Sequence, residues 1–194
     1  YSNRYIKLRN QYRELHRKNR MVRKQDHETF SNELLSMGDT FFVETMSFKG
    51  LQKRSKKTEK NKQGKFKKKK RFGRTLSNRA PAMLLSCLER KLKYNGLKLN
   101  KVNTAKVKAS QYSHFDDTYT KKSLNKRWND FNGIMVQRDL YSSFLLMNIV
   151  HDKDLDKIDR DLCFKTFDLF LKLHDELISK LKKEPHTLKS MGIR

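Results

Sequence analysis

The sequence predicts an α/β protein, and the order of its apolar patterns is the reason. A run of aromatic and β-branched residues at 40–46 indicates a strand, and a weaker run at 97–103 indicates a second one. Helical periodicity precedes the first run, separates the two runs and follows the second. The order is therefore helix, strand, helix, strand and helix, with a sheet that is only partly contained in this chain.

Two helices are expected before the first strand. Apolar residues recur there at alternating steps of four and three, which is typical of a helix with one narrow apolar seam: Tyr1, Tyr5, Leu8, Tyr12, Leu15, Asn19 and Val22. A second helix is expected from Asp26, as its N-cap, to Gly38, as its terminator. The strand at 40–46 is apolar on both faces, as in a central strand.

Three more helical segments follow. Pro81 marks a helix start, Leu84, Leu88 and Leu92 share one face, and Gly96 ends that helix. The segment 104–133 is polar and irregular, with Trp128 and Phe131 as apolar anchors. Residues 140–150 are apolar all round, which indicates a buried helix. A long amphipathic helix closed by Pro185 is marked by Leu155, Ile158, Leu162, Leu169, Leu173, Leu177 and Leu181.

Positive charge is concentrated in one segment. The chain has 46 Lys and Arg against 21 Asp and Glu, a formal charge of +25, and residues 49–74 alone hold 14 basic residues and one acid, Glu59. So few apolar residues interrupt this segment that we expect a mobile loop. The loop is either a solvated basic surface or, as we favour, a strip that binds a polyanion such as nucleic acid. An anionic membrane ranks lower, because no amphipathic apolar face accompanies the strip.

Several protein classes are excluded by length and composition. The longest apolar stretch, 140–150, is far shorter than the roughly 20 residues that a membrane-spanning helix needs. No signal peptide precedes it, and two cysteines, Cys87 and Cys163, make no disulfide framework; both lie on apolar helical faces, as core thiols do. The chain starts at Tyr1 inside a helical pattern, so we expect it to be a piece of a longer protein.

Two acidic residues stand in unexpected places. Glu44 interrupts the apolar strand TFFVETM, where a buried carboxylate is costly unless it is paired or bound to a metal. Asp139 stands where the polar segment turns into the apolar helix. Each has a simple alternative explanation, since Glu44 could pair with a cation at a strand end and Asp139, near a helix N-terminus, could stabilise the helix dipole or cap the helix. Together, converging carboxylates at a strand end would hold Mg²⁺ or Mn²⁺ for phosphodiester cleavage.

The order of three segments resembles the nuclease half of a known family. FFVETMSFKGL, then LLSCLERKLKYNGLKLNKVN, then VQRDLYSSFLLMNI are similar in order and spacing to the RuvC-like module of TnpB. TnpB proteins are transposon-encoded, RNA-guided DNA endonucleases related to the type V CRISPR effectors. The resemblance covers roughly residues 1–150 and implies the C-terminal part of an RNase H-like (RuvC) fold with long flanking helices.

The resemblance also implies a site, partners and a division of the chain. Glu44 matches the second of three metal-binding acids in the family and Asp139 the third. The first, an aspartate, would precede Tyr1, so the N-terminal remainder of the protein or a partner chain would supply it. Guide RNA and target DNA are the implied partners, and the bacterial cytoplasm, at the nucleoid, is the implied location. The expected parts are a basic helical segment at 1–38, a nuclease core at 39–150 and a helical extension at 151–194.

The chain departs from the family at 104–133. Family members commonly carry two CxxC pairs there that bind zinc, whereas this insertion has no cysteine, and His114 alone cannot hold structural zinc; we predict none. Aromatic residues are expected to form an apolar plug there, with stacking on unpaired bases as the alternative: Tyr112, Phe115, Tyr119, Trp128 and Phe131. Lys126 is expected to face nucleic acid beside the basic residues assigned to binding, which are Lys49, Lys53, Arg54, Lys56, Lys57, Lys67, Lys68, Lys69, Lys70, Arg71, Arg74, Lys121, Lys122, Arg127 and Arg138.

Two other functions remain open on the sequence. A relative of this fold that has lost its acids would be a nuclease-inactive, RNA-guided DNA-binding protein that acts as a repressor. A basic, RNA-binding structural protein would explain the charge and the long helices, but it gives no reason for an acid inside TFFVETM.

Overall fold

The protein contains two compact units. The computed structural model describes residues 1–53, 56, 58–67, 73–123, 125–152, 154–184 and 191–193. Unit 1 combines 1–41 with 46–99, and unit 2 combines 42–45 with 100–194. This division differs from the expected parts at 1–38, 39–150 and 151–194. The segments on both sides of the first strand fold together, and the C-terminal helix belongs with the later strands.

A single long helix, α1 (Asn3–Met37), replaces the two helices expected at the start of unit 1. Ser2 is its N-cap, with Oγ accepting a hydrogen bond from the amide of Tyr5 at 3.3 Å, and Gly38 ends it as expected. The break predicted at Asp26 was wrong. The residues that follow Asp26 stay helical because the helix at Pro81–Tyr94 packs against them.

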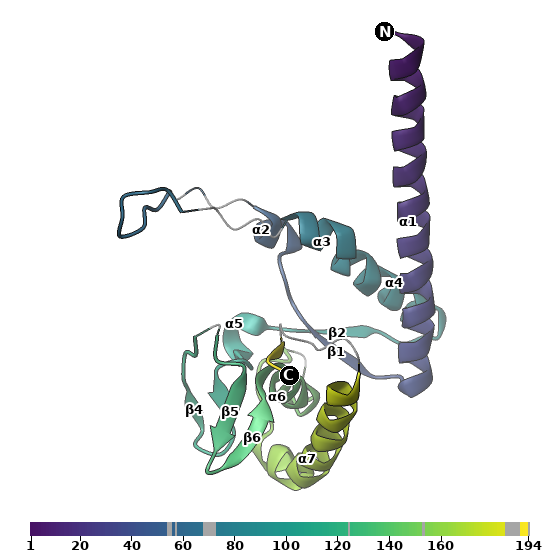
Figure 1. Ribbon diagram of the computed structural model, residues 1–194. Helices are drawn as coiled ribbons and strands as arrows, with labels where there is room; N and C mark the ends of the chain where they lie inside the picture. Colours follow the sequence, from purple (N-terminus) through teal and green to yellow (C-terminus); the bar gives the residue numbers. More distant parts are fainter. Residues whose placement is uncertain are drawn as a thin grey trace. The chain divides into compact units, whose positions relative to one another are not determined.

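Helix α4 (Pro81–Tyr94) packs against the C-terminal half of α1 (Figure 1). Its start at Pro81 and the buried face with Leu88 and Leu92 confirm the prediction. Glu28 of α1 is the centre of the contact. Its backbone carbonyl accepts a hydrogen bond from the Lys91 ammonium at 2.7 Å, and its carboxylate pairs with Arg90 at 2.5 Å. Polar contacts from Glu28 therefore hold α4 against one face of α1.

The basic segment 49–74 contains more regular structure than the mobile loop we expected. Helix α2 (Phe48–Gln52) begins it and α3 (Gly73–Arg79) ends it. Between them an antiparallel bridge pairs Lys60 with Phe66, and the side chain of Asn61 accepts hydrogen bonds from the amides of residues 63 and 65. The turn is completed by Gly64, whose φ of +77° favours glycine.

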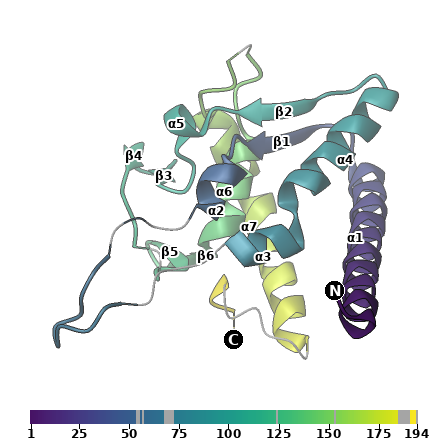
Figure 2. The ribbon, with the colours of Figure 1, turned by 90° about the horizontal axis from the view of Figure 1, so that it is seen from above.

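The two predicted strands are present and shorter than predicted. Strand β1 (Phe41–Glu44) pairs with β2 (Leu99–Val102), and the two run in the same direction in Figure 2. Parallel neighbours need a crossover connection, which the chain makes through α2, α3 and α4. The strand–helix–strand order expected from the sequence is therefore present, and the RNase H-like assignment stays a prediction.

The polar stretch after β2 folds into short elements instead of irregular loops. Helix α5 (Thr104–Val107) is followed by two hairpins, β3 (Tyr112–Ser113) with β4 (Thr118–Tyr119) and β5 (Trp128–Phe131) with β6 (Ile134–Gln137). In the second hairpin Phe131 pairs with Ile134 across Asn132 and Gly133, both at positive φ. An Asn-Gly pair between two strands is a hairpin pattern, so the signal for this turn is present in the sequence.

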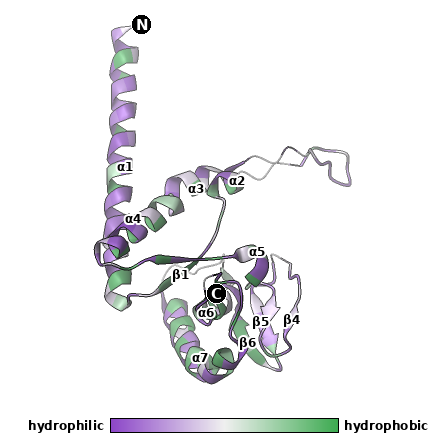
Figure 3. Cartoon of the chain, turned by 180° about the vertical axis from the view of Figure 1, so that it is seen from behind, coloured by the Kyte–Doolittle hydropathy of each residue, from purple (hydrophilic) through white to green (hydrophobic). Residues whose placement is uncertain are grey.

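Two helices complete unit 2 around its core. Helix α6 (Arg138–Met147) covers most of the predicted buried helix, and α7 (Arg160–Lys183) most of the predicted amphipathic one. Their apolar faces meet in a cluster that holds Val102, Val107, Ala109, Tyr112, Val136, Tyr141, Phe144, Leu145, Ile149, Cys163 and Phe167. Along α7 hydrophobic and hydrophilic residues alternate, whereas most of α1 is hydrophilic (Figure 3). No helix in the described ranges is long and apolar enough to cross a bilayer.

Candidate functional site

Glu44 ends β1 on a face that turns toward the core of unit 2. Side chains alternate along a strand, so Glu44 shares its face with Phe42, which packs against the core cluster. The next residue, Thr45, is anchored by its amide and its hydroxyl, which both donate to the Val102 carbonyl at 3.2 and 3.0 Å. The strand end is thus fixed, and the Glu44 side chain is half-buried.

Burial raises the pKa of the Glu44 carboxyl above its ordinary value of 4.5, and burial is the only cause. Among the residues that the structure describes, no Lys, Arg or His forms an ion pair or hydrogen bond with it. A half-buried carboxylate without a cation is unusual in a chain of net charge +25. The alternative in which Glu44 pairs with a nearby cation therefore finds no support in the described part of the chain.

Asp139 lies in the first turn of α6 and is half exposed, with 49% of its side chain accessible. Its carboxylate accepts a hydrogen bond from Gln137 Nε2 at 3.4 Å and lies 3.5 Å from Arg138 Nε. Helical spacing places it on the side of α6 that carries Ser142 and Ser143, away from the buried Tyr141. Asp139 is not the N-cap, because Gln137 fills that position.

The two carboxylates belong to one compact unit, but the structure does not bring them into contact. The hydrogen bond that the Asp139 carboxylate accepts comes from Gln137 Nε2, and its ion pair is with Arg138. No group of three or more His, Cys, Asp or Glu side chains suited to a metal gathers anywhere in the described ranges. In type, the donors fit a hard divalent cation that prefers oxygen ligands. In number, Glu44 and Asp139 are two ligands of the expected three.

The basic residues of unit 1 lie mostly on the surface. Five of those assigned to nucleic acid are described and exposed: Lys49, Lys53, Lys56, Lys67 and Arg74. Lys67 pairs with Glu59 at 3.3 Å, a solvent-exposed pair that salt screens. Six further assignments lie outside the described residues: Arg54, Lys57, Lys68, Lys69, Lys70 and Arg71. The exposed charge is consistent with binding to a polyanion and selects no particular one.

The basic residues of unit 2 are used partly within the fold. Arg138 is only 11% exposed, and its Nη1 donates to the carbonyls of residues 123 and 126 at 3.3 and 3.1 Å. Lys122 donates to Asn129 Oδ1 at 2.7 Å, and burial, Lys126 and Arg138 together lower its pKa. Arg127 is half-buried, whereas Lys121 is exposed. Lys121 and Lys126 are therefore better placed than Lys122 and Arg138 to contact a ligand.

Most of the aromatic residues of the insertion pack within unit 2. The Phe115 and Phe131 rings lie 5.0 Å apart, and both residues pack against the core cluster. Tyr112 is buried and donates to Asp117 at 2.9 Å. Trp128 is half-buried, and Tyr119 is 53% exposed. Packing accounts for most of the set, and Tyr119 is its most accessible ring.

His114 is a buried residue whose environment the sequence did not reveal. Its Nδ1 lies 2.7 Å from the Tyr141 hydroxyl, and the aromatic rings of Phe115, Phe164 and Phe167 lie within 5.1 Å of its ring, centroid to centroid. Burial and the nearby Arg160 lower the pKa of His114 to about 4. The imidazole is therefore neutral at pH 7. It is part of the core, and no other potential ligand joins it in a metal cluster among the residues described.

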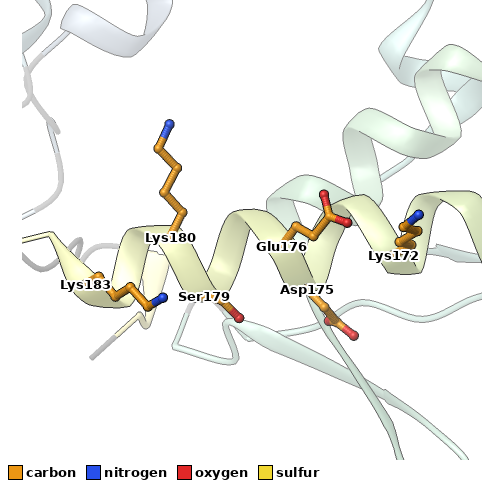
Figure 4. A pocket seen from close by; sticks show the side chains of 6 residues that line it. All are labelled: Lys172, Asp175, Glu176, Ser179, Lys180 and Lys183. Carbon is orange, nitrogen blue, oxygen red and sulfur yellow. The ribbon is translucent and has the colours of Figure 1, made fainter.

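Two hollows along α7 are lined by described residues, and neither contains a predicted acid. One, of about 660 Å³, follows a charged face of that helix, lined by Lys172, Asp175, Glu176, Ser179, Lys180 and Lys183 (Figure 4). Its mixture of cations and acids defines no ligand. The other, of about 320 Å³, is an apolar groove between α6 and α7 with Leu140 and Leu173 among its lining residues.

Comparisons of the chain with protein-family models, with curated proteins and with solved structures gave no match.

Proposed function

We propose that this chain is the nuclease portion of an RNA-guided DNA endonuclease of the TnpB type, in which Glu44 and Asp139 are two ligands of a Mg²⁺ (or Mn²⁺) site. The observation that supports this best is Glu44 itself. It is a half-buried carboxylate on a fixed strand end with no cation partner in the described ranges. A divalent cation would compensate its burial, which no other described group does.

The site would be completed by a third carboxylate from outside the residues described. Strand β1 has β2 as its one paired neighbour in the described part, so a further strand beside β1 is a natural carrier for that ligand. The N-terminal remainder of the protein or a separate chain would supply it. Packing of that segment against β1 would also bury Glu44 further and would determine the distance between the Asp139 carboxylate and the bound ion.

The chemistry of the proposed site divides between the ion and the chain. Bound divalent cations would activate water and stabilise the leaving oxygen during phosphodiester cleavage. Glu44 would hold its position through the strand end that Thr45 anchors. Asp139 would hold its position through the first turn of α6. Neither residue needs to transfer a proton in this scheme.

Recognition of nucleic acid would rest on the exposed cations. Guide RNA and target DNA would bind through phosphate contacts with Lys49, Lys53, Lys56, Lys67 and Arg74 of unit 1 and with Lys121 of unit 2, and sequence would be read by base pairing. Arg127 and the six assigned residues outside the described ranges keep this proposed role. Lys122 and Arg138 do not, because they make hydrogen bonds within the fold. The N-terminal half of α1 is a second basic surface for the same contacts.

The decisive experiment compares amide variants in the complete protein with its guide. Glu44→Gln and Asp139→Asn keep the shape of each side chain, so cleavage of target DNA should be abolished while binding, measured by gel shift, is retained. Asp161→Asn is the matched control. Arg160-Asp161-Leu162 opens α7 as Arg138-Asp139-Leu140 opens α6, and this control should cleave normally. Retained cleavage by either amide variant would refute the metal assignment.

A second candidate is the nuclease-inactive, RNA-guided DNA-binding protein. Two observations favour it: no group of three or more potential metal ligands gathers in the described ranges, and the side chain of Asp139 is half exposed. It predicts that the unaltered complete protein binds target DNA without cutting it in Mg²⁺ or Mn²⁺. A basic RNA-binding structural protein would instead bind RNA with no dependence on a guide.

A further inference from the structure

Gln137 connects the proposed ligand Asp139 to the C-terminal end of the described chain. It is the N-cap of α6 and is fully buried. Its Oε1 accepts hydrogen bonds from the amides of Asp139 and Leu140 at 2.7 and 2.8 Å. Its Nε2 donates to the Asp139 carboxylate at 3.4 Å and to the Met191 carbonyl at 3.2 Å. One side chain therefore contacts both the start of α6 and residue 191.

The orientation of this amide is determined by its partners. Two backbone N–H groups require an acceptor at Oε1, so the NH₂ group must face Asp139 and Met191. The backbone of Gln137 is fixed as well, because its N–H donates to His174 Nε2 at 3.0 Å. Without the Met191 carbonyl, the buried Nε2 group would keep only its long hydrogen bond to Asp139, so one buried N–H would lose its partner and the hold on the amide would weaken.

The segment Met191–Ile193 is docked on unit 2 by more than that one contact. The Trp128 indole N–H donates to the Gly192 carbonyl at 3.0 Å, and Ile193 is fully buried. Gly192 has φ of +73°, and a Cβ there would lie 2.7 Å from the Cβ of Arg127. Only glycine fits this close approach, so the docking depends on residue 192.

We propose that Gln137 is a positioning residue for the Asp139 carboxylate, and that the docked segment Met191–Ile193 holds Gln137 in place. This inference rests on the proposed role of Asp139 as a metal ligand. Groups that hydrogen-bond to a metal ligand fix its orientation, and their loss typically lowers metal affinity by roughly 10–100-fold. The C-terminal end of the described chain thereby becomes part of the proposed site without touching the ion.

The docking can be measured without any metal or nucleic acid, because Trp128 is the only tryptophan of the chain. In Gly192→Ala the new methyl group would clash with Arg127, so the segment should leave Trp128. Its emission should shift to longer wavelength, and acrylamide should quench it more strongly. The matched control is Gly96→Ala, which has a similar φ of +71° and no atom within 4 Å of the added Cβ, and should leave emission unchanged. An unchanged emission in Gly192→Ala would overturn the docking.

The positioning role is measured by Mn²⁺ binding to the complete protein without DNA, followed by the electron paramagnetic resonance of free Mn²⁺. Gly192→Ala and Gln137→Glu should each weaken binding by roughly 10–100-fold. Gln137→Glu keeps an acceptor for the two amides of α6 and replaces the donor facing Asp139 with a carboxylate oxygen. Thermal melting shows whether each variant is folded, and Asp161→Asn should bind as the unaltered protein does.

The outcomes separate this inference from the proposed function. Loss of Mn²⁺ binding in Glu44→Gln and Asp139→Asn, together with weaker binding in Gly192→Ala and Gln137→Glu, supports both. Loss of binding in the first pair with unaltered affinity in the second pair overturns the positioning role alone. Unaltered affinity in all four folded variants overturns the metal site, and the positioning role with it.

Discussion

The two long helices are held in place by different means. Helix α1 has 35 residues, of which Ser31 alone is buried, whereas the 24 residues of α7 bury Cys163, Phe167, His174 and Ile178. The contacts of α1 with the rest of unit 1 gather near Arg23, His27, Glu28 and Asn32, and its apolar seam before Val22 stays exposed. Helix α7 is therefore stabilised by packing, and the N-terminal half of α1 by local interactions.

This difference means that α7 is part of the core of unit 2, whereas the N-terminal half of α1 is exposed and available to a partner. Arginine or lysine occupies four of the positions that flank the seam of α1, at residues 4, 9, 18 and 23, and no acid occupies the other flanking positions at 2, 11, 16 and 25. Two copies of α1 aligned along their seams would face each other with like charges. A polyanion meets no such repulsion, so the charge pattern supports contact with nucleic acid better than self-association.

The largest expected effect is a difference in stability between a core substitution in α7 and a surface substitution in α1. Phe167→Ala in α7 removes a ring that lies 4.9 Å from Phe115 and 5.0 Å from His114, and should lower the free energy of unfolding of unit 2 by about 3–5 kcal/mol. Leu15→Ala, in the exposed seam of α1, should change the stability of the protein by less than about 0.5 kcal/mol. Urea unfolding followed by Trp128 fluorescence for unit 2 and by circular dichroism for the whole chain measures both. A large loss with Leu15→Ala would show that the seam is packed.

The next largest effect is a loss of stability at low pH, which we expect in unit 2 because His114 is buried in its core. His114 has a pKa of about 4 in the folded protein against an ordinary 6.5, so the unfolded chain takes up a proton first as pH falls. The stability that neutral His114 confers is complete above pH 6.5 and is lost progressively between pH 6.5 and 4, by about 3 kcal/mol in all.

The check for His114 is a set of urea titrations at several pH values. In His114→Gln, which cannot titrate, the loss of stability between pH 6.5 and 4 should be smaller by that amount, even if the variant is less stable throughout. Equal pH dependence in the two proteins would show that the imidazole is accessible to protons in the folded state.

The sequence identified the elements whose patterns are local. The strand predicted at 40–46, the helix start at Pro81 and the helix predicted at 140–150 each follow from neighbouring residues. The structure has the strand at Phe41–Glu44, the helix start at Pro81 and the third element at Arg138–Met147, with Tyr141, Phe144 and Leu145 as its buried residues. The break at Asp26 failed because a capping residue is compatible with a helix interior when tertiary contacts continue on both sides. The hairpin at 128–137 was missed although Asn132 and Gly133 mark its turn.

The candidate site was predictable only in part, for a physical reason. An acid within an apolar strand can be recognised from its sequence neighbours alone, so Glu44 could be singled out. The buried position of His114 and the fit of Gly192 against Arg127 depend on residues far apart in the chain, and no local pattern encodes them. Arg138 and Lys122 looked like ligand-binding cations because charge counts do not show which backbone carbonyls a fold leaves to be satisfied.

The smallest expected effect comes from removing the N-cap side chains of α7 and α1. Asp159 caps α7 by accepting a hydrogen bond from the amide of Leu162 at 2.9 Å, and Ser2 caps α1 at 3.3 Å. Asp159→Ala should lower the stability of unit 2 by about 1 kcal/mol, because α7 unfolds only together with its core. Ser2→Ala should leave global unfolding unchanged and speed amide hydrogen exchange in the first turns of α1 only. If Ser2→Ala instead lowered global stability as much as Asp159→Ala, the first turns of α1 would be coupled to a core, and its seam would be a packed face.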